Sequence, residues 1–289
     1  MRYAPFALAL VITIINQAAP SAASAACQPV HLDVRLHDRR AMLDIAIDDR
    51  PANMVLDTGA SQILLMADAP DRLGLVAAAD HPPEQRRSYG QVFQVHFVRA
   101  RHIAFAGLSR EVTDLAVAGS IEAGIDGLFT DDRLQQADFD LAQGRVDLVC
   151  DGTPEWARAA NVVSLPLEDG SRPFGQAVIN GQVLRVLFDT GSPVSSMTLQ
   201  AAKRSGVPVG KAPDEDAAGL GGSPLHAWAG RIAEMRLGGQ VVHDVPIQVV
   251  DKPNASADMI AGFDVFLRHR IWIDRKGGRL VIQMSNGAF

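Results

Sequence analysis

The chain has 289 residues, of which 47% are hydrophobic and 21% charged, a composition typical of a folded globular protein and not of a disordered chain. Lys and Arg total 27 against 33 Asp and Glu, and the resulting formal net charge of −6 argues against nucleic acid as a partner. The 2 cysteines exclude a disulfide-framework miniprotein and a zinc ribbon, and the length leaves room for two ordinary domains.

The first 26 residues have the layout of a secretory signal peptide. A basic start at Met1-Arg2 precedes a nearly continuous apolar run over 4–15, and small residues with Ala-x-Ala cleavage options follow over 18–26. The apolar run is about a dozen residues, short of the roughly 20 that span a bilayer, which favours cleavage over a membrane anchor. We therefore expect an exported protein, periplasmic or secreted, without a membrane span after cleavage.

Cleavage after Ala26 would leave Cys27 at the start of the mature chain. In an oxidising compartment, Cys27 and Cys150 are candidates for a disulfide that closes a loop around the first half of the chain, with two separate thiols as the alternative. Lipid attachment at Cys27 is a minority alternative, because the residues before it lack the aliphatic side chain usual in bacterial lipoprotein signals.

The rest of the chain repeats itself at an offset near 132 residues. The motif Asp57-Thr58-Gly59, preceded by two apolar residues, recurs as Asp189-Thr190-Gly191, and 189 − 57 = 132. Further segments correspond at offsets of 130 to 135, namely 42–48 with 175–181, 72–75 with 204–207, 89–90 with 220–221, 107–115 with 238–245, and 123–128 with 258–263. Each copy closes with two apolar strands around a glycine turn, over 138–149 and 271–282.

This order of correspondences predicts a duplicated lobe. The expected N-terminal lobe is 27–150, the connector is 151–161 and the C-terminal lobe is 162–289. Both copies consist of short alternating segments with frequent turn residues, which indicates β-strands and at most a helix or two. The predicted fold class is all-β, with two homologous small β-barrel lobes and an active-site cleft between them.

The paired Asp-Thr-Gly turns indicate a carboxylate dyad. One such turn is common and often only caps backbone N–H groups. Two copies in related lobes suggest a pseudo-twofold axis with Asp57 and Asp189 facing each other, so that the pair shares one proton. A water molecule between them would then have a general base on one side, while the neighbouring acid polarises a carbonyl group. This chemistry hydrolyses an amide without a covalent intermediate.

At these residues the sequence resembles the aspartic peptidases of the pepsin and retropepsin type, and the bacterial exported single-chain retropepsin-like proteins in particular. Each copy has the Asp-Thr-Gly motif, and Met259-Ile260-Ala261-Gly262-Phe263-Asp264 closely matches the later glycine motif of the family. The resemblance implies that Asp57 and Asp189 are catalytic. It also implies that Thr58 and Thr190 hold the dyad by reciprocal hydrogen bonds and that Gly59 and Gly191 allow the loops to approach.

The family closes its cleft with β-hairpin flaps, and each lobe contains a candidate for such a flap. In lobe one the candidates are Tyr89-Gly90, where a tyrosine precedes a glycine as in pepsin-like enzymes. In lobe two, Leu220-Gly221-Gly222 fits the glycine-rich style of retropepsins. An ordinary half-buried aromatic residue is the alternative for Tyr89, and the sequence leaves open whether one flap or two close the cleft.

Two departures from symmetry concern the electrostatics of the dyad. Asp126 aligns with Ala261 where an apolar residue is expected, so an extra acid would raise the pKa values of the dyad, unless the local strand is displaced. Ser192 follows the second motif where Ala60 follows the first, and a hydroxyl there can favour the ionised form of Asp189. We therefore expect Asp189 to be the more acidic partner and Asp57 to hold the shared proton.

The expected function is an aspartic endopeptidase that acts on peptide or protein substrates. No metal and no organic cofactor are expected, because the 8 His residues lack the spacing of a zinc helix and the mechanism needs neither. A monomer suffices for catalysis, since both halves of the dyad lie in one chain. The alternative is a catalytically silent peptide- or protein-binding module on the same two-lobed fold.

Overall fold

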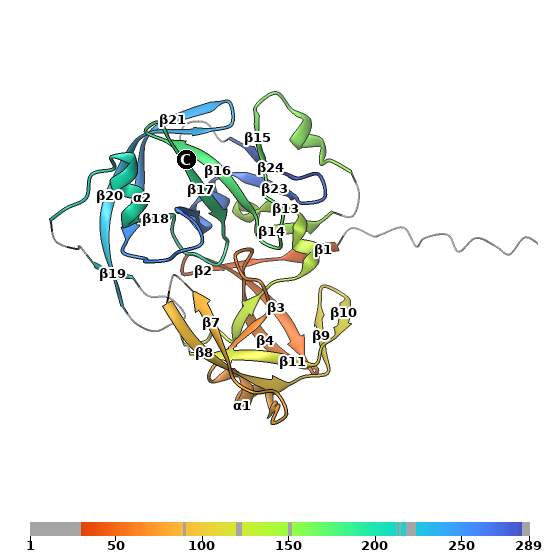
Figure 1. Ribbon diagram of the computed structural model, residues 1–289. Helices are drawn as coiled ribbons and strands as arrows, with labels where there is room; N and C mark the ends of the chain where they lie inside the picture. Colours follow the sequence, from red (N-terminus) through yellow and green to blue (C-terminus); the bar gives the residue numbers. More distant parts are fainter. Residues whose placement is uncertain are drawn as a thin grey trace, which may run out of the picture.

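The computed structural model describes residues 30–88, 91–119, 123–149, 152–211, 213, 215–217 and 224–284. The chain forms two β-rich lobes beside a shared sheet (Figure 1). In Figure 1 the orange and yellow strands of the first lobe lie below the green, cyan and blue strands of the second. The predicted all-β class with two related lobes is confirmed.

The shared sheet joins the two halves of the chain and contains three strands from each. Its order is β1 (Val30–Asp33), β14 (Arg145–Leu148), β13 (Gln136–Asp140), β23 (Arg270–Asp274), β24 (Arg279–Gln283) and β15 (Val162–Pro166). The halves meet where β13 and β23 run antiparallel, with Asp138 opposite Trp272. Phe139 and Phe266 pack edge to face with ring centroids 5.3 Å apart, so the core continues from one half into the other.

Lobe one is an eleven-stranded sheet. Its main path is β10 (Leu108–Glu111), β9 (His102–Phe105), β3 (Arg40–Ile47), β4 (Arg50–Leu56), β12 (Gly127–Phe129), β5 (Leu64–Met66), β11 (Asp114–Ala118), β8 (Gln91–Arg99) and β6 (Val76–Ala77). Two further strands attach to it, β2 (Arg35–His37) to β3 and β7 (Glu84–Ser88) to β8. The short helix α1 (Ala69–Leu73) follows β5.

Lobe two is a seven-stranded sheet that closes on itself. Its order is β16 (Phe174–Ile179), β17 (Gln182–Phe188), β22 (Met259–Ala261), β18 (Ser196–Thr198), β21 (Gln240–Val250), β20 (Leu225–Leu237) and β19 (Glu215–Ala217). A further pairing of β16 with β20, with Ile179 opposite Met235, closes the barrel. Helix α2 (Leu199–Ser205) begins at the capping hydroxyl of Thr198 and ends at Gly206, whose φ of 66° suits a left-handed C-cap.

Most strands of the two lobes correspond in order and pairing at an offset near 132. Hairpin β3–β4 turns at Asp48-Asp49 and hairpin β16–β17 turns at Asn180-Gly181, and all four residues have positive φ, as a tight two-residue hairpin turn requires. The long strand β20 of lobe two corresponds to β8 and β9 of lobe one taken together, and β21 corresponds to β10 and β11 taken together. The duplication inferred from sequence spacing therefore extends through the strand topology.

Short helices connect the lobes to the shared sheet. Helix α3 (Phe263–Arg268) follows β22 in lobe two, and the 3-10 helix η1 (Asp132–Gln135) lies between β12 and β13 in lobe one. Two further 3-10 helices are η2 (Leu141–Gln143) and η3 (Glu155–Arg158). Within the described part of the chain, no helix has the length and apolarity that a membrane crossing needs.

Candidate active site

The two Asp-Thr-Gly turns begin where β4 and β17 end, at equivalent points of the two lobes. The backbone N–H of Asp57 donates to the carbonyl oxygen of Phe129 (2.9 Å), and that of Asp189 donates to Ala261 (2.9 Å). Each turn is therefore anchored to the neighbouring strand in the sheet of its own lobe, β12 or β22. Both carboxylates are buried, with residue exposures of 7% for Asp57 and 8% for Asp189.

Reciprocal threonine hydrogen bonds hold the two turns together. The N–H of Thr58 donates to Oγ1 of Thr190 and the N–H of Thr190 donates to Oγ1 of Thr58, both at 3.1 Å. The Thr58 hydroxyl donates to the carbonyl of Phe188 (2.8 Å) and the Thr190 hydroxyl to that of Leu56 (2.6 Å). All four groups are buried and paired, so the turns form one rigid unit across the interface of the lobes.

Glycine in each turn lets the opposite carboxylate come close. A Cβ added to Gly59 would lie 2.6 Å from Oδ1 of Asp189, and one added to Gly191 would lie 2.6 Å from Oδ2 of Asp57. No side chain fits at either position, because such distances are below any real Cβ contact. The structure thus brings Asp57 and Asp189 side by side, each against the backbone of the other lobe.

The environment of the two carboxyl groups differs despite this symmetry. Burial raises the pKa of Asp57 well above its ordinary value, and the negative charge of Asp189 and a hydrogen bond between the two groups raise it further. Burial also raises the pKa of Asp189. The bond from Asp57, the N–H of Gly191 and the charge of Lys252 counter this effect and favour its ionised form. Of the two carboxyl groups, Asp57 therefore has the higher pKa.

The expectation for the dyad rested on a hydrogen bond from the Ser192 hydroxyl to Asp189, but that hydroxyl donates to the carbonyl oxygen of Val194 (3.0 Å). The backbone N–H of Ser192 is instead among the groups that lower the pKa of Asp189. Lys252 is the unexpected contributor. It lies after β21, is 6% exposed, and its Nζ donates to Oγ of Ser196 (2.9 Å).

A cleft of about 540 Å³ opens over the dyad and is lined by both lobes. Arg86, Arg87 and Ser88 of β7 line it from lobe one, so the β7–β8 hairpin lies at the cleft. Tyr89 and Gly90, the flap candidates of this hairpin, lie outside the described residues, as do Leu220, Gly221 and Gly222 of lobe two. No described residue of β19 or β20 lines the cleft.

The interpretation of Asp126 as an acid that perturbs the dyad is wrong. The strand pairing aligns Asp126 with Asp258, since β12 pairs with β4 in the register in which β22 pairs with β17. Asp126 accepts hydrogen bonds from the N–H of Asn53 (2.7 Å) and from Nε of Arg72 (2.9 Å). Its role is structural, because its charge is neutralised by Arg72. The alignment of Asp126 with Ala261, which residue type suggests, is therefore three residues out of register.

Asp258 repeats this arrangement in lobe two. It accepts from the N–H of Arg185 (3.1 Å) and from Arg204 (2.7 Å). Arg72 and Arg204 are 132 residues apart, as are Asp126 and Asp258. In each lobe, one Asp–Arg pair therefore links the helix after the Asp-Thr-Gly turn to the start of β12 or β22.

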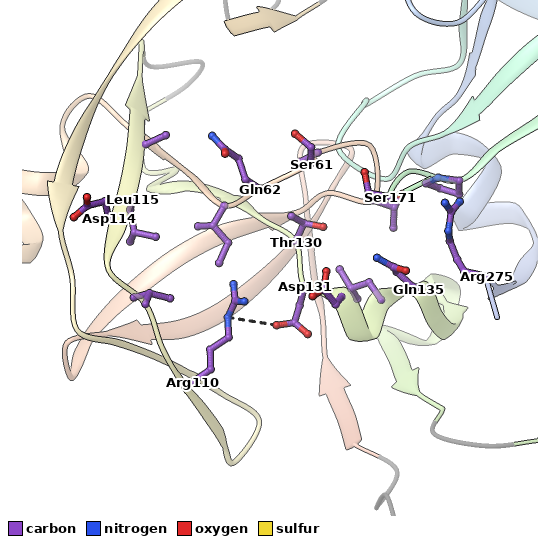
Figure 2. Close-up of a pocket in the computed structure, with 18 of the residues that line it drawn as sticks. Ser61, Gln62, Arg110, Asp114, Leu115, Thr130, Asp131, Gln135, Ser171 and Arg275 are labelled. Carbon is purple, nitrogen blue, oxygen red and sulfur yellow. Dashed lines mark ion pairs between the residues drawn. The ribbon is translucent and has the colours of Figure 1, made fainter. Parts of the chain in front are cut away.

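A second cavity, of about 350 Å³, lies beside the lobe-one turn (Figure 2). Ser61 and Gln62 line it on one side, with Thr130 and Asp131 on another, and Asp131 forms an ion pair with Arg110. Thr130 is the counterpart of Gly262, where an added Cβ would lie 2.6 Å from the carbonyl carbon of Val194. The corresponding loop in lobe two packs directly against Gly262.

The described residues show no metal site. No group of three or more His, Cys, Asp and Glu with the geometry to hold a metal ion is found among them. Cys27 and Cys150, the disulfide candidates, lie outside the described residues.

The comparisons with known proteins agree with this geometry. The model of the aspartyl protease family matches twice, over 43–132 and 175–265, and the two matches begin 175 − 43 = 132 residues apart. The matched segments make up more than half of the chain, which therefore belongs to the aspartyl protease family. The predicted relationship to the pepsin and retropepsin type is confirmed.

A solved structure shows the same fold. The aspartic proteinase from Irpex lacteus is 12% identical to this chain, and the superposition has a TM-score of 0.58, covering 90% of this chain and 98% of that one. No curated protein matches the sequence significantly.

Sequence reasoning missed the basic residues among the described lining of the cleft. Arg40 and Arg172 had a detectable signal, because 172 − 40 = 132 places them at equivalent points of the two copies. Lys252 had none, since a single lysine after an apolar strand is ordinary and only the fold brings it near Asp189.

Proposed function

We propose that this protein is an aspartic endopeptidase whose catalytic residues are Asp57 and Asp189. The observation that carries the proposal is the pair of Asp-Thr-Gly turns, locked by reciprocal hydrogen bonds so that two buried carboxyl groups with unequal proton affinity share one cleft. Membership of the aspartyl protease family supports a hydrolase of this type.

In the proposed mechanism, Asp189 is the general base and Asp57 the general acid. Asp189 takes a proton from a water molecule between the carboxyl groups as that water attacks the scissile carbonyl carbon. Asp57 donates its hydrogen to the carbonyl oxygen to give a tetrahedral diol. The C–N bond then breaks as Asp189 returns its proton to the leaving nitrogen and Asp57 takes a proton back from a hydroxyl of the diol, which restores the starting state of the dyad. The backbone N–H groups of Ala60 and Gly191, which donate to Asp57 (2.8 Å) and Asp189 (2.9 Å), orient the carboxyl groups.

The cleft supports binding of an extended peptide across the lobes. It spans lining residues from β7 in lobe one to the loop after β21 in lobe two. Strand-like substrates make backbone hydrogen bonds that are independent of sequence, while side-chain pockets select among them. We further propose that the protein is exported, on the strength of the signal-like segment in residues 1–26.

The test is digestion of a mixed peptide library by the mature chain from about pH 3 to 8, a range that covers the titration of a carboxyl dyad. The matched protein is Asp189→Asn, with folding verified by circular dichroism. Cleavage by the wild type that disappears in the variant supports the endopeptidase. Absence of cleavage at every pH by folded wild-type protein overturns it and favours a peptide-binding module.

A further inference from the structure

Basic side chains are concentrated in the described lining of the cleft over the dyad, although the whole chain has a negative net charge. Among the described residues, the lining includes five basic side chains, namely Arg40, Arg86, Arg87, Arg172 and Lys252. The full chain has a formal net charge of −6, so this concentration runs against its overall charge. Clefts lined by one sign of charge raise the local concentration of ligands of the opposite sign.

The acidic residues of the cleft do not cancel this charge. The described lining contains Asp57, Asp189 and Asp258. The first two are the dyad, which holds a proton in its active form, and Asp258 is engaged by Arg204 and by the backbone of Arg185. Of the five cations, Arg86 forms an ion pair with Glu84 on its own strand. The lobe-two side of the cleft carries Arg172 and Lys252, whose charges act on the carboxyl groups of the dyad.

Lys252 is buried in the lobe-two wall. Its Nζ donates to Ser196 on β18, and burial lowers its pKa to about 7 despite the attraction of Asp189. An ammonium group in such a place loses most of its hydration, and nearby anions compensate for that loss. Asp189 already attracts Lys252, and a carboxylate that enters the cleft beside Lys252 would add a second interaction of the same sign.

Arg172 lies just before β16 and lines the same cleft. Its guanidinium stands 4.9 Å from the centre of the Phe174 ring, and burial and the charge of Arg185 lower its pKa while both dyad carboxyl groups raise it. Among the described residues no acidic side chain forms an ion pair with it. A guanidinium on an aromatic face, with its N–H groups available, is suited to binding a planar carboxylate in two places.

We propose that the cleft selects peptides with acidic side chains next to the scissile bond, whose carboxylates are bound by Lys252 and Arg172. This inference rests on the proposed peptidase function and names its substrate class. Arg40 stands at the equivalent point of lobe one, which extends the positive lining to both sides of the dyad. Neutral peptides would bind through their backbone alone.

Lys252 also lowers the pKa of Asp189, and this effect on the dyad can be separated by experiment from the binding of a substrate carboxylate. A change in the dyad alters the cleavage of every peptide by the same factor. Loss of a carboxylate-binding group changes the ratio between an acidic peptide and its neutral isostere. The ratio of kcat/KM for a Glu peptide to that for the matched Gln peptide is therefore the readout.

The experiment uses peptide pairs that differ only by Glu or Gln at each position flanking a mapped cleavage site. At about pH 6 the glutamate is ionised, and Lys252, whose pKa is about 7, is protonated. We expect a Glu preference of about tenfold in kcat/KM that weakens as salt is added. Lys252→Met and Arg172→Gln should each reduce the ratio severalfold. Arg231→Gln, which removes an exposed cation paired with Asp244, should leave it unchanged.

Equal cleavage of the Glu and Gln peptides by the wild type overturns the inference and leaves the peptidase standing. A Glu preference that survives in both variants overturns the assignment to Lys252 and Arg172. If Lys252→Met does not fold, Arg172→Gln alone tests the assignment, because Arg172 is only half-buried. If neither peptide is cleaved, the proposed function fails, and fluorescence anisotropy of the labelled pair with wild-type protein decides the inference. Tighter binding of the Glu peptide then supports it, and equal binding overturns it.

Discussion

The two lobes present the same turn to the active site but support it differently. In lobe two, the loop after Asp189 packs on Gly262, whose N–H donates to Ser195 (3.0 Å), and the N–H of Phe263 donates to Ser192 (2.7 Å). In lobe one the equivalent position is Thr130, and a cavity of about 350 Å³ lies between it and the loop after Asp57.

The charges around the two turns differ as well. Lys252 stabilises the ionised form of Asp189, while burial, the negative charge of Asp189 and the bond between the carboxyl groups keep the proton on Asp57. The backbone of the two turns is nearly symmetric, so it positions the carboxyl groups without assigning them roles. Lys252, which lies outside the turns, adds a charge near Asp189 that the near-symmetric backbone does not supply.

The largest effect is expected from the threonine bonds that the lobes share. Thr58→Val or Thr190→Val removes one hydroxyl and leaves a buried N–H and a buried carbonyl unsatisfied, at a cost of about 3 kcal/mol in unfolding free energy. The two variants should lose similar stability, because their contacts are reciprocal. Urea denaturation measures both, and a large difference between them would break the symmetry described for the turns.

The next effect separates the lobes. In Gly262→Ala the new Cβ meets the backbone of Val194, and we expect a loss of about 2 kcal/mol. Thr130→Ala borders the lobe-one cavity and should cost less than about 1 kcal/mol. Thermal or urea unfolding of the two variants checks the contrast. Equal costs would mean that the two loops are packed alike.

A smaller and symmetric effect is expected from the Asp–Arg pairs. Arg72→Gln and Arg204→Gln each weaken a charge-assisted hydrogen bond to a carboxylate, Asp126 or Asp258, at a cost of about 1 kcal/mol. Neither change should alter the pH profile of peptide cleavage, because neither pair touches the dyad. A shifted profile in Arg72→Gln would restore Asp126 as a group that acts on the dyad.

The subtlest effect is a displaced pH profile in Lys252→Met. Removal of the positive charge takes away an interaction that lowers the pKa of Asp189, so that pKa rises. The acidic limb of kcat/KM should therefore move to higher pH, while Asp57 remains the proton holder. Profiles of wild type and variant on a neutral peptide measure the displacement. A limb that stays in place, or moves to lower pH, would exclude Lys252 as a determinant of the base.

The sequence predicted the fold because equivalent residues of the two lobes lie about 132 positions apart, and each lobe carries the Asp-Thr-Gly motif at that spacing. It misassigned Asp126, since matching by residue type allowed a shift of three that the ladder between β4 and β12 forbids. Arg72 and Arg204 already carried the correct offset, and Arg40 and Arg172 shared it. Lys252 could not be found in this way, because its proximity to Asp189 depends on how β18, β21 and β22 pack in three dimensions.

The central claim, that Asp57 and Asp189 act as one catalytic unit, is tested most directly by comparing Asp57→Asn, Asp189→Asn and the double variant in single-turnover peptide cleavage. The account predicts that each single change lowers the rate by at least about a thousandfold, with no further loss in the double variant, because either change already abolishes the shared proton. Substantial activity in one single variant, or losses that multiply in the double variant, would contradict it.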